Sequence, residues 1–298
     1  MSSPPRRALA VLVGMLCLAA AVPATAASPD AQARTVLDKA AVRGGLIVHL
    51  GCGDGRLTAA LHASDAYLVQ GLDADPARVA KARAHVRAKG LYGPVTVNPL
   101  AGERLPYAPD LVALVVADDL GRVPMDEVMR VLAPGGAAWV AGKRTVKPRP
   151  ETIDEWTHYL HGPDNNPTAR DRRVAPPERL RWQSDPMWCR SHDGVPSSIL
   201  VVLSAKGRLF SIIDEGLIGQ PGLGQRWTLV ARDAFNGVLL WKRRLEGRAS
   251  QKSIVAVGDR LFATFRRNDP LTVLDAATGE TLRTVDETRG SDELVCLD

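Results

Sequence analysis

Residues 48–61 read VHLGCGDGRLTAAL, in which an apolar stretch leads into three alternating glycines and then into a helical pattern. Glycine permits the positive φ angles of a sharp turn, and a Cβ at Gly51 or Gly53 would obstruct the close approach of a ligand to the backbone. The helix that follows would offer free N–H groups and the positive end of its dipole. The stretch therefore predicts a ligand-binding loop between a β-strand and an α-helix.

The chain around this loop, from about residue 29 to 142, alternates strand patterns with helical patterns. Strands are expected at 46–50, 66–74, 95–100, 111–120 and 137–142, and helices at 30–42, 55–63, 76–90 and 125–133. Asp75 and Pro76 form a helix start signal, and Gly90 forms a stop signal. The runs LIVHL and LVALVV are almost continuously apolar, as in strands buried on both faces. The sequence therefore predicts an α/β fold with a parallel sheet covered by helices on both faces.

An acidic residue follows the loop at an informative distance. Asp73 ends the second predicted strand, 20 residues after Gly53, and a carboxylate there can accept hydrogen bonds from both hydroxyls of a ribose. The loop reads G-x-G-x-G rather than the G-x-G-x-x-G of dinucleotide-binding enzymes, and Asp54 inside it would repel a phosphate. The pattern favours a ligand with a ribose and an ammonium group, which describes S-adenosylmethionine.

Four motifs in order, GLIVHLGCGDG, GLDADP, LPY and RVLAPGGAAWV, resemble those of class I S-adenosylmethionine-dependent methyltransferases over about residues 30–142. The resemblance implies a Rossmann-like domain with the loop glycines around the methionine moiety and Asp73 on the ribose. Gly102 stands where family members commonly carry an acidic residue near the adenine, and Glu103 is the candidate substitute. The residues that the resemblance assigns to the cofactor site are Gly51, Cys52, Gly53, Gly55, Asp73, Glu103, Asp118 and Asp119.

The resemblance leaves the activity open. No general base stands out, so the catalytic residues are unknown, although methyl transfer can proceed when the acceptor is simply positioned near the sulfonium. The sixth and seventh strands of the family are not evident after the fifth. His49 is expected to be structural, and Cys52 to be a small filling residue. The alternative is a catalytically silent Rossmann-like domain that keeps its glycines for the turn.

The pattern changes after Gly142. The segment KRTVKPRPETIDEW at 143–156 is basic and contains prolines, which predicts that the chain passes directly into a linker. Just after it, His158 and His161 could hold a metal ion, but no third or fourth ligand is identifiable. The favoured interpretation is a polar connector that docks Trp156 and Tyr159 onto the next domain, with no metal.

A repeat appears from Ile199 onward. ARDAFNGVLLW at 231–241 and VLDAATGETLR at 273–283 align Asp233 with Asp275 and Gly237 with Gly279, both at a spacing of 42 residues. The aspartates can accept backbone N–H groups in a tight turn, and the glycines supply a positive φ. A repeat of this length indicates a blade of a β-propeller. Trp241 is expected to pack between blades, and Arg283 takes its place in the next repeat.

The repeats resemble those of pyrroloquinoline-quinone-type propellers over about residues 199–298. Quinoprotein dehydrogenases use adjacent cysteines and a calcium site, whereas Cys189 and Cys296 are isolated, so pyrroloquinoline quinone is not expected in this part of the chain. About 100 residues hold fewer blades than a closed propeller needs. The sequence therefore predicts an incomplete propeller that belongs to a longer chain or closes with a partner.

The N-terminus has the three parts of an export signal. Arg6 and Arg7 precede an apolar run from Ala8 to Val22, and small residues end at Ala26. Cleavage there would leave no stable membrane span, and the protein is expected in the periplasm or outside the cell. The net charge of +5 is scattered rather than clustered, which does not indicate a nucleic-acid partner.

These observations predict four regions: a signal peptide at 1–26, a methyltransferase-like domain at 28–145, a connector at 146–198 and propeller repeats at 199–298. The leading hypothesis is S-adenosylmethionine-dependent methyl transfer to an unknown acceptor by an exported enzyme. The alternative is a binding or scaffold protein with a silent α/β domain, which could bind a protein partner through the propeller. A third hypothesis is a quinone-dependent oxidoreductase whose catalytic blades lie outside these residues.

Overall fold

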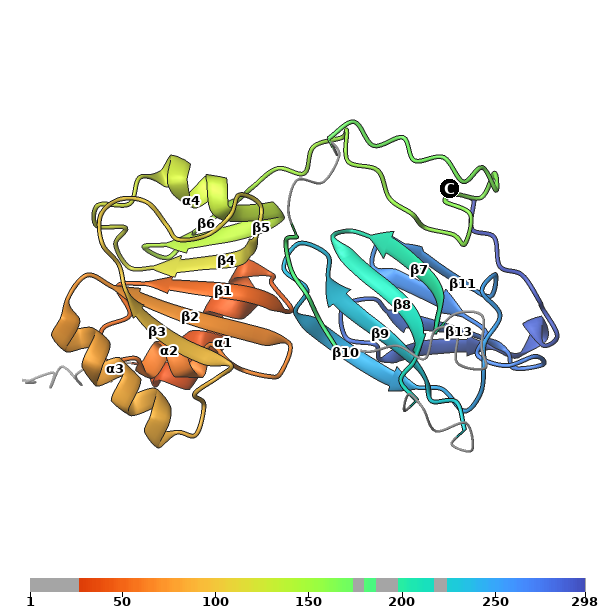
Figure 1. The fold of residues 1–298 in the computed structure, drawn as a ribbon, viewed down its shortest axis with the longest axis horizontal. Coiled ribbons are helices and arrows are strands. Elements are labelled where there is room, and N and C mark those ends of the chain that lie inside the picture. The colour runs from red at the N-terminus through yellow and green to blue at the C-terminus, as the bar shows by residue number, and fades with distance from the viewer. Residues whose placement is uncertain (1–26, 174–179, 186–197, 217–223, 298) are drawn as a thin grey trace, which may run out of the picture.

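The computed structural model describes residues 27–173, 180–185, 198–216 and 224–297. An α/β unit and a β-rich unit lie side by side (Figure 1). The predicted signal peptide and Cys189 lie outside the described residues.

The α/β unit consists of one six-stranded sheet with helices against it. Its elements are α1 (Pro29–Ala40), β1 (Gly45–Leu50), α2 (Arg56–Ala60), β2 (Tyr67–Asp73), α3 (Pro76–Ala88), β3 (Val95–Pro99), β4 (Val112–Ala117), α4 (Met125–Val131), β5 (Leu132–Val140) and β6 (Lys143–Val146). The strand order is β3-β2-β1-β4-β5-β6. The first five strands pair in parallel, which confirms the predicted parallel sheet.

Two details of this sheet differ from the prediction. Leu132 pairs with Val112 and Ala137 with Leu114, so β5 begins five residues earlier than expected and contains a bulge over Pro134–Gly136. The prediction that the chain passes directly into a linker after Gly142 is wrong, because β6 turns back and pairs antiparallel with β5. All four residues of β6 are exposed, so they lack the apolar run by which a buried strand is recognised.

Helix starts in the α/β unit follow local signals. The Asp75 carboxylate accepts a hydrogen bond from the Ala77 N–H at 2.8 Å, and Pro76 occupies the first turn of α3. Gly90, just past this helix, has a φ of 69°. These contacts confirm the predicted start and stop, because each depends on residues only a few positions apart.

Apolar side chains cover both faces of the sheet. On one face, α1 contributes Ala33, Val36, Leu37 and Ala40, and α3 contributes Val79, Ala82 and Val86, to a cluster with side chains of the strands. On the other face, Leu105 and residues of α4 pack against Val48, Leu72 and Val115. Every residue of β1 and of β4 is buried, as their continuous apolar runs predicted.

His49 connects β1 to α2 inside the sheet. Its Nδ1 lies 2.8 Å from the Thr58 hydroxyl, and both side chains are buried. Burial lowers the pKa of His49 to about 4, while the negative charges of Asp118 and Asp73 act in the opposite direction. The imidazole is therefore neutral at pH 7. Its buried contact with Thr58 is consistent with the structural role predicted for it.

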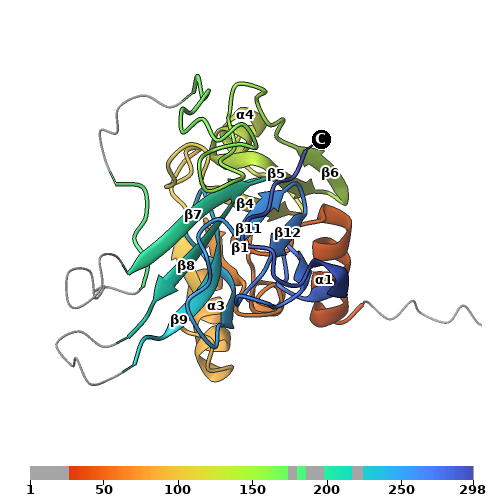
Figure 2. The same cartoon turned by 90° about the vertical axis from the view of Figure 1, so that its right-hand side faces the viewer.

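The described residues of the β-rich unit form two four-stranded antiparallel sheets. The first has β7 (Ile199–Ala205), β8 (Arg208–Asp214), β9 (Trp227–Asp233) and β10 (Leu239–Arg244), and the second has β11 (Ile254–Val257), β12 (Arg260–Ala263), β13 (Leu271–Asp275) and β14 (Thr281–Val285). Each sheet keeps its strands in chain order. The first strands of the two sheets, β7 and β11, lie next to each other (Figure 2).

The repeated turn has the same geometry in both sheets. Asp233 accepts the N–H groups of Phe235 and Asn236 at 2.8 and 3.2 Å, and Asp275 accepts those of Ala277 and Thr278 at 2.9 and 3.0 Å. The glycine that closes each turn, Gly237 or Gly279, has a φ of 74°. Both predicted roles are confirmed.

A tryptophan from an earlier segment packs on each of these glycines. The ring of Trp241 on β10 would lie 2.6 Å from a Cβ at Gly279, and its Nε1 donates to the Ala276 carbonyl at 3.1 Å. Trp182 makes the same contact with Gly237 and donates to the Ala234 carbonyl, also at 3.1 Å. The prediction that Trp241 packs between the sheets is therefore confirmed, whereas the equivalent role of Trp182 was not anticipated.

The two units meet at the amino ends of the parallel strands. A Cβ at Gly44 would lie 2.5 Å from the Leu240 side chain, and one at Gly45 would lie 2.7 Å from the Asp233 carboxylate. The Asn236 side chain donates to the Leu111 carbonyl, which immediately precedes β4, at 3.1 Å. The glycine pair thus allows the first repeated turn to approach the sheet closely. The carboxyl ends of the strands, which carry the predicted loop, lie at the opposite edge (Figure 1).

We expect Gly279→Ala to destabilise the protein more than Gly258→Ala. Both glycines have a positive φ, which costs a side-chain-bearing residue about 1–2 kcal/mol. A Cβ at Gly258 meets nothing within 4 Å, whereas one at Gly279 overlaps the Trp241 ring and adds about 1–3 kcal/mol of overpacking. Urea unfolding of the two variants measures the difference, and equal free energies of unfolding would contradict the tryptophan docking.

We also expect His49 to make folding stability depend on pH. Its folded-state pKa, about 4, lies below the unfolded value of 6.5, so the unfolded chain binds the proton more tightly. The resulting loss of stability is absent above pH 6.5 and grows to about 3 kcal/mol as the pH falls toward 4. Urea unfolding at several pH values should show a shallower decline for His49→Asn than for the wild type. Parallel declines would exclude this role.

Candidate functional site

The loop between β1 and α2 lies at the carboxyl edge of the sheet. The N–H groups of Gly51 and Cys52 donate to the Leu72 carbonyl of β2 at 2.8 and 3.2 Å, and the Gly55 N–H donates to the Cys52 carbonyl at 2.9 Å. Gly51, Gly53 and Gly55 have φ angles of 69°, 56° and 79°. The alternating glycines therefore allow three left-handed residues within one short turn.

The three glycines are required for different reasons. A Cβ at Gly55 would lie 2.8 Å from Ala82 of α3, so this glycine lets the loop and the helix pack closely. A Cβ at Gly51 meets nothing within 4 Å, and one at Gly53 meets only the Gly51 carbonyl oxygen, at 4.0 Å. The space in front of Gly51 and Gly53 is open, as a backbone that contacts a ligand requires.

Asp73 connects this loop to the end of β2. Its Oδ2 accepts the Gly53 N–H at 2.9 Å, and its Oδ1 accepts the Asp75 N–H at 3.0 Å. The side chain is only 4% exposed. A carboxylate has about four acceptor sites, so two remain for hydroxyl donors. The predicted acidic residue is therefore in place, and it also holds the loop in shape.

The other predicted acidic residues lie at or beyond the ends of neighbouring strands. Asp118 and Asp119 directly follow β4, and both are exposed. The Asp119 carboxylate accepts the Gly121 N–H at 3.1 Å, so it stabilises a local turn. The negative charges of Asp118 and Asp73 both act to raise the pKa of His49 on β1. Both carboxylates therefore lie close enough to this strand to interact with it electrostatically. Glu103 is exposed in the segment between β3 and β4.

Cys52 points away from solvent inside the loop. Burial, followed by the charge of Asp73, raises the pKa of its thiol to about 12. The thiol is therefore protonated at neutral pH and is not a nucleophile. Its Sγ lies 3.1 Å from where a Cβ at Gly71 would be, so Gly71 provides the room for this side chain. The prediction that Cys52 fills space agrees with this position.

Two supporting residues were not anticipated from the sequence. Gly71 sits inside β2, and its role depends on Cys52 from the neighbouring loop. The Leu72 carbonyl receives two N–H groups of the loop. An isolated glycine within a strand pattern is a general signal of close backbone or side-chain approach, and it could have pointed to Gly71.

The connector histidines make other contacts. His161 Nε2 lies 2.7 Å from the Asp154 carboxylate, and His158 Nδ1 lies 2.7 Å from the Thr157 hydroxyl. No group of three metal-ligating side chains occurs among the residues that the structure describes. Trp156 and Tyr159 pack against the core of the β-rich unit, as predicted for a docked connector.

Solved structures that match part of the chain include several methyltransferases. The chain is 20% identical to geranyl diphosphate C-methyltransferase from Streptomyces coelicolor (37% of this chain, 44% of that chain, TM-score 0.34). It is 18% identical to a SAM-dependent methyltransferase from Aquifex aeolicus (36% and 62%, TM-score 0.33) and 25% identical to the [4+2]-cyclase SpnF (37% and 43%, TM-score 0.35). The match spans between two fifths and two thirds of these chains. No curated protein matches the sequence.

A family model described as a methyltransferase domain matches residues 47–136. The matched stretch begins in β1 and ends in β5, so it contains the glycine loop, Asp73 and the Asp118–Asp119 pair. The β-rich unit lies outside the match. The matched residues, 47–136, are therefore a methyltransferase domain.

Proposed function

We propose that the α/β unit binds S-adenosylmethionine at the glycine loop and transfers its methyl group to an acceptor. The observation that carries this proposal is the open space in front of Gly51 and Gly53, next to a carboxylate that retains acceptor capacity. The match to a methyltransferase domain over residues 47–136 supports the same conclusion.

The residues fit the chemical groups of this cofactor. Asp73 would accept hydrogen bonds from the ribose hydroxyls, and the backbone of Gly51 and Gly53 would contact the methionine moiety. Asp118 lies at the neighbouring strand end, and its negative charge favours a cationic ligand at this edge. Glu103 is the candidate contact near the adenine. Gly55 and Cys52 shape the loop through their packing on Ala82 and Gly71.

The bound cofactor supplies an electrophilic methyl group on a sulfonium sulfur. The chain's contribution would be to hold the acceptor in line with that methyl group, since orientation alone accounts for much of the barrier in such transfers. His49 and Cys52 are unsuited to proton transfer, because one is buried against Thr58 and the other has a pKa near 12. We therefore assign no general base, and the acceptor is an unidentified small molecule.

We further propose that the two antiparallel sheets are blades of a quinoprotein-like propeller. The equivalent turns at Asp233 and Asp275 and the equivalent tryptophan contacts support this assignment. The N-terminal sequence supports export. No helix among the described residues is long and apolar enough to cross a membrane.

Calorimetric titration of S-adenosylmethionine into the full chain tests the cofactor site. We expect a micromolar dissociation constant that Asp73→Ala weakens by at least about tenfold, because a hydrogen bond to a charged group contributes roughly 1.5–3 kcal/mol. Gly53→Ala should also weaken binding, because its Cβ would enter the open space in front of the loop.

Gly90→Ala is the matched control for Gly53→Ala. Gly90 also has a left-handed backbone, with a φ of 69°, and a Cβ there would meet nothing within 4 Å. It lies after α3, away from the glycine loop. Circular dichroism would establish that each variant is folded. An absence of heat with folded wild-type protein would support the silent-domain alternative. Equal weakening by Gly53→Ala and Gly90→Ala would contradict a cofactor at the loop.

A further inference from the structure

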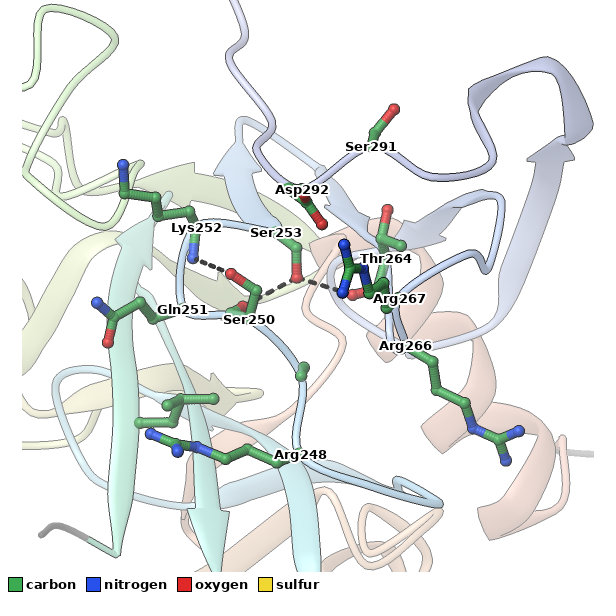
Figure 3. Close-up of a pocket in the computed structure, with 12 residues that line it drawn as sticks. Arg248, Ser250, Gln251, Lys252, Ser253, Thr264, Arg266, Arg267, Ser291 and Asp292 are labelled. Carbon is green, nitrogen blue, oxygen red and sulfur yellow. Dashed lines mark hydrogen bonds between the residues drawn. The ribbon is translucent and has the colours of Figure 1, made fainter.

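A cavity of about 660 Å³ lies in the β-rich unit, away from the glycine loop. Its walls come from the connection between β10 and β11, from residues just after β12, from Ser291 and Asp292, and from Leu200 on β7. Figure 3 labels side chains from the first three of these segments around this space. Cavities of about 300–1,000 Å³ commonly hold small molecules, so the size admits such a ligand.

The wall of this cavity is rich in positive charge. It carries four cationic side chains, Arg248, Lys252, Arg266 and Arg267. Asp292 is the one carboxylate among the lining residues that the structure describes. The lining thus has a formal excess of positive charge, which favours an anionic ligand.

Partners outside the cavity only partly offset this charge. Lys252 lies 3.4 Å from Glu293, and Arg266 pairs with Glu246. Both pairs involve exposed side chains, and exposed ion pairs contribute little, so a ligand can replace them at small cost. Arg267 makes no hydrogen bond or ion pair with the part of the chain that the structure describes, which leaves its guanidinium available.

The cavity also contains a buried hydroxyl without a partner. Thr264 is 3% exposed, and its Oγ1 has no hydrogen-bond partner among the described residues. Thr264 directly follows β12, and Figure 3 shows its side chain directed toward Ser291. An unsatisfied buried hydroxyl carries a free-energy cost, and a ligand oxygen would remove that cost.

Neighbouring serines order the cavity floor beside this hydroxyl. The Ser253 Oγ lies 2.9 Å from the Ser250 carbonyl and 2.8 Å from the Thr264 carbonyl. The Ser250 Oγ accepts the Lys252 backbone N–H at 3.3 Å, which leaves its own proton to donate. Hydroxyl donors and guanidinium donors therefore approach the cavity from different segments.

We propose that this cavity binds a small molecule that carries a phosphate group. Phosphate presents acceptor oxygens in several directions, whereas a carboxylate presents two in one plane, and the donors here come from more than one side of the cavity. Arg267 forms a charged hydrogen bond with the phosphate, and Thr264 and Ser250 donate their hydroxyl protons. The site is separate from the glycine loop and is independent of methyl transfer.

Calorimetric titration of inorganic pyrophosphate into the full chain at low salt tests this proposal. We expect saturable binding that Arg267→Gln and Thr264→Val each weaken by at least about tenfold. Valine keeps the shape of threonine and removes the unpaired hydroxyl, so the thermal midpoint of Thr264→Val should stay the same or rise. Loss of binding in that variant would then not reflect unfolding.

Arg283→Gln is the control for general charge, because Arg283 is an exposed arginine on β14 outside the cavity. It should bind pyrophosphate as the wild type does. Citrate serves as the carboxylate probe and should bind more weakly than pyrophosphate. The proposal is overturned by an absence of pyrophosphate binding, by unchanged affinity in both cavity variants, by equal weakening in Arg283→Gln, or by tighter binding of citrate.

Discussion

The Asp73 carboxylate fixes the geometry on which the candidate site depends. One oxygen receives the Gly53 N–H of the loop after β1, and the other receives the Asp75 N–H at the start of α3. Because the side chain is almost fully buried, losing either bond would leave a costly unsatisfied charge. A single residue therefore holds both the loop after β1 and the start of α3. Its carboxylate also retains free acceptor sites at the carboxyl ends of the strands. The group that holds the loop in shape is thus the one that we propose for cofactor recognition.

The β-rich unit depends on a turn motif that occurs once in each of its two sheets. In each sheet an aspartate closes a turn, a glycine supplies the left-handed residue, and a tryptophan from an earlier segment packs on that glycine. The first of these turns also contacts the amino ends of β1 and β4 through Asp233 and Asn236. The β-rich unit thus covers the edge of the parallel sheet opposite the glycine loop, and it leaves the loop accessible.

Much of the α/β unit could be predicted from the sequence, because its signals are local. Strand and helix periodicity, the Asp75 cap and the G-x-G-x-G turn each involve residues only a few positions apart. The spacing of Asp73 from Gly53 predicted their proximity, since consecutive parallel strands end at one edge of the sheet. The repeated turns were predicted for the same reason, because aspartate and glycine lie within one five-residue segment.

Only the tertiary structure decided features that join distant segments. Gly44 is needed because Leu240 approaches it, and Gly71 is needed because Cys52 occupies the space beside it. Trp182 packs on a glycine 55 residues later, with β7, β8 and β9 between them in the chain. The cationic cavity likewise combines segments that share no motif. The sequence by itself determined the elements and their turns through local backbone preferences. Which surfaces meet depends on the packing of the whole chain, and a short window of residues does not encode it.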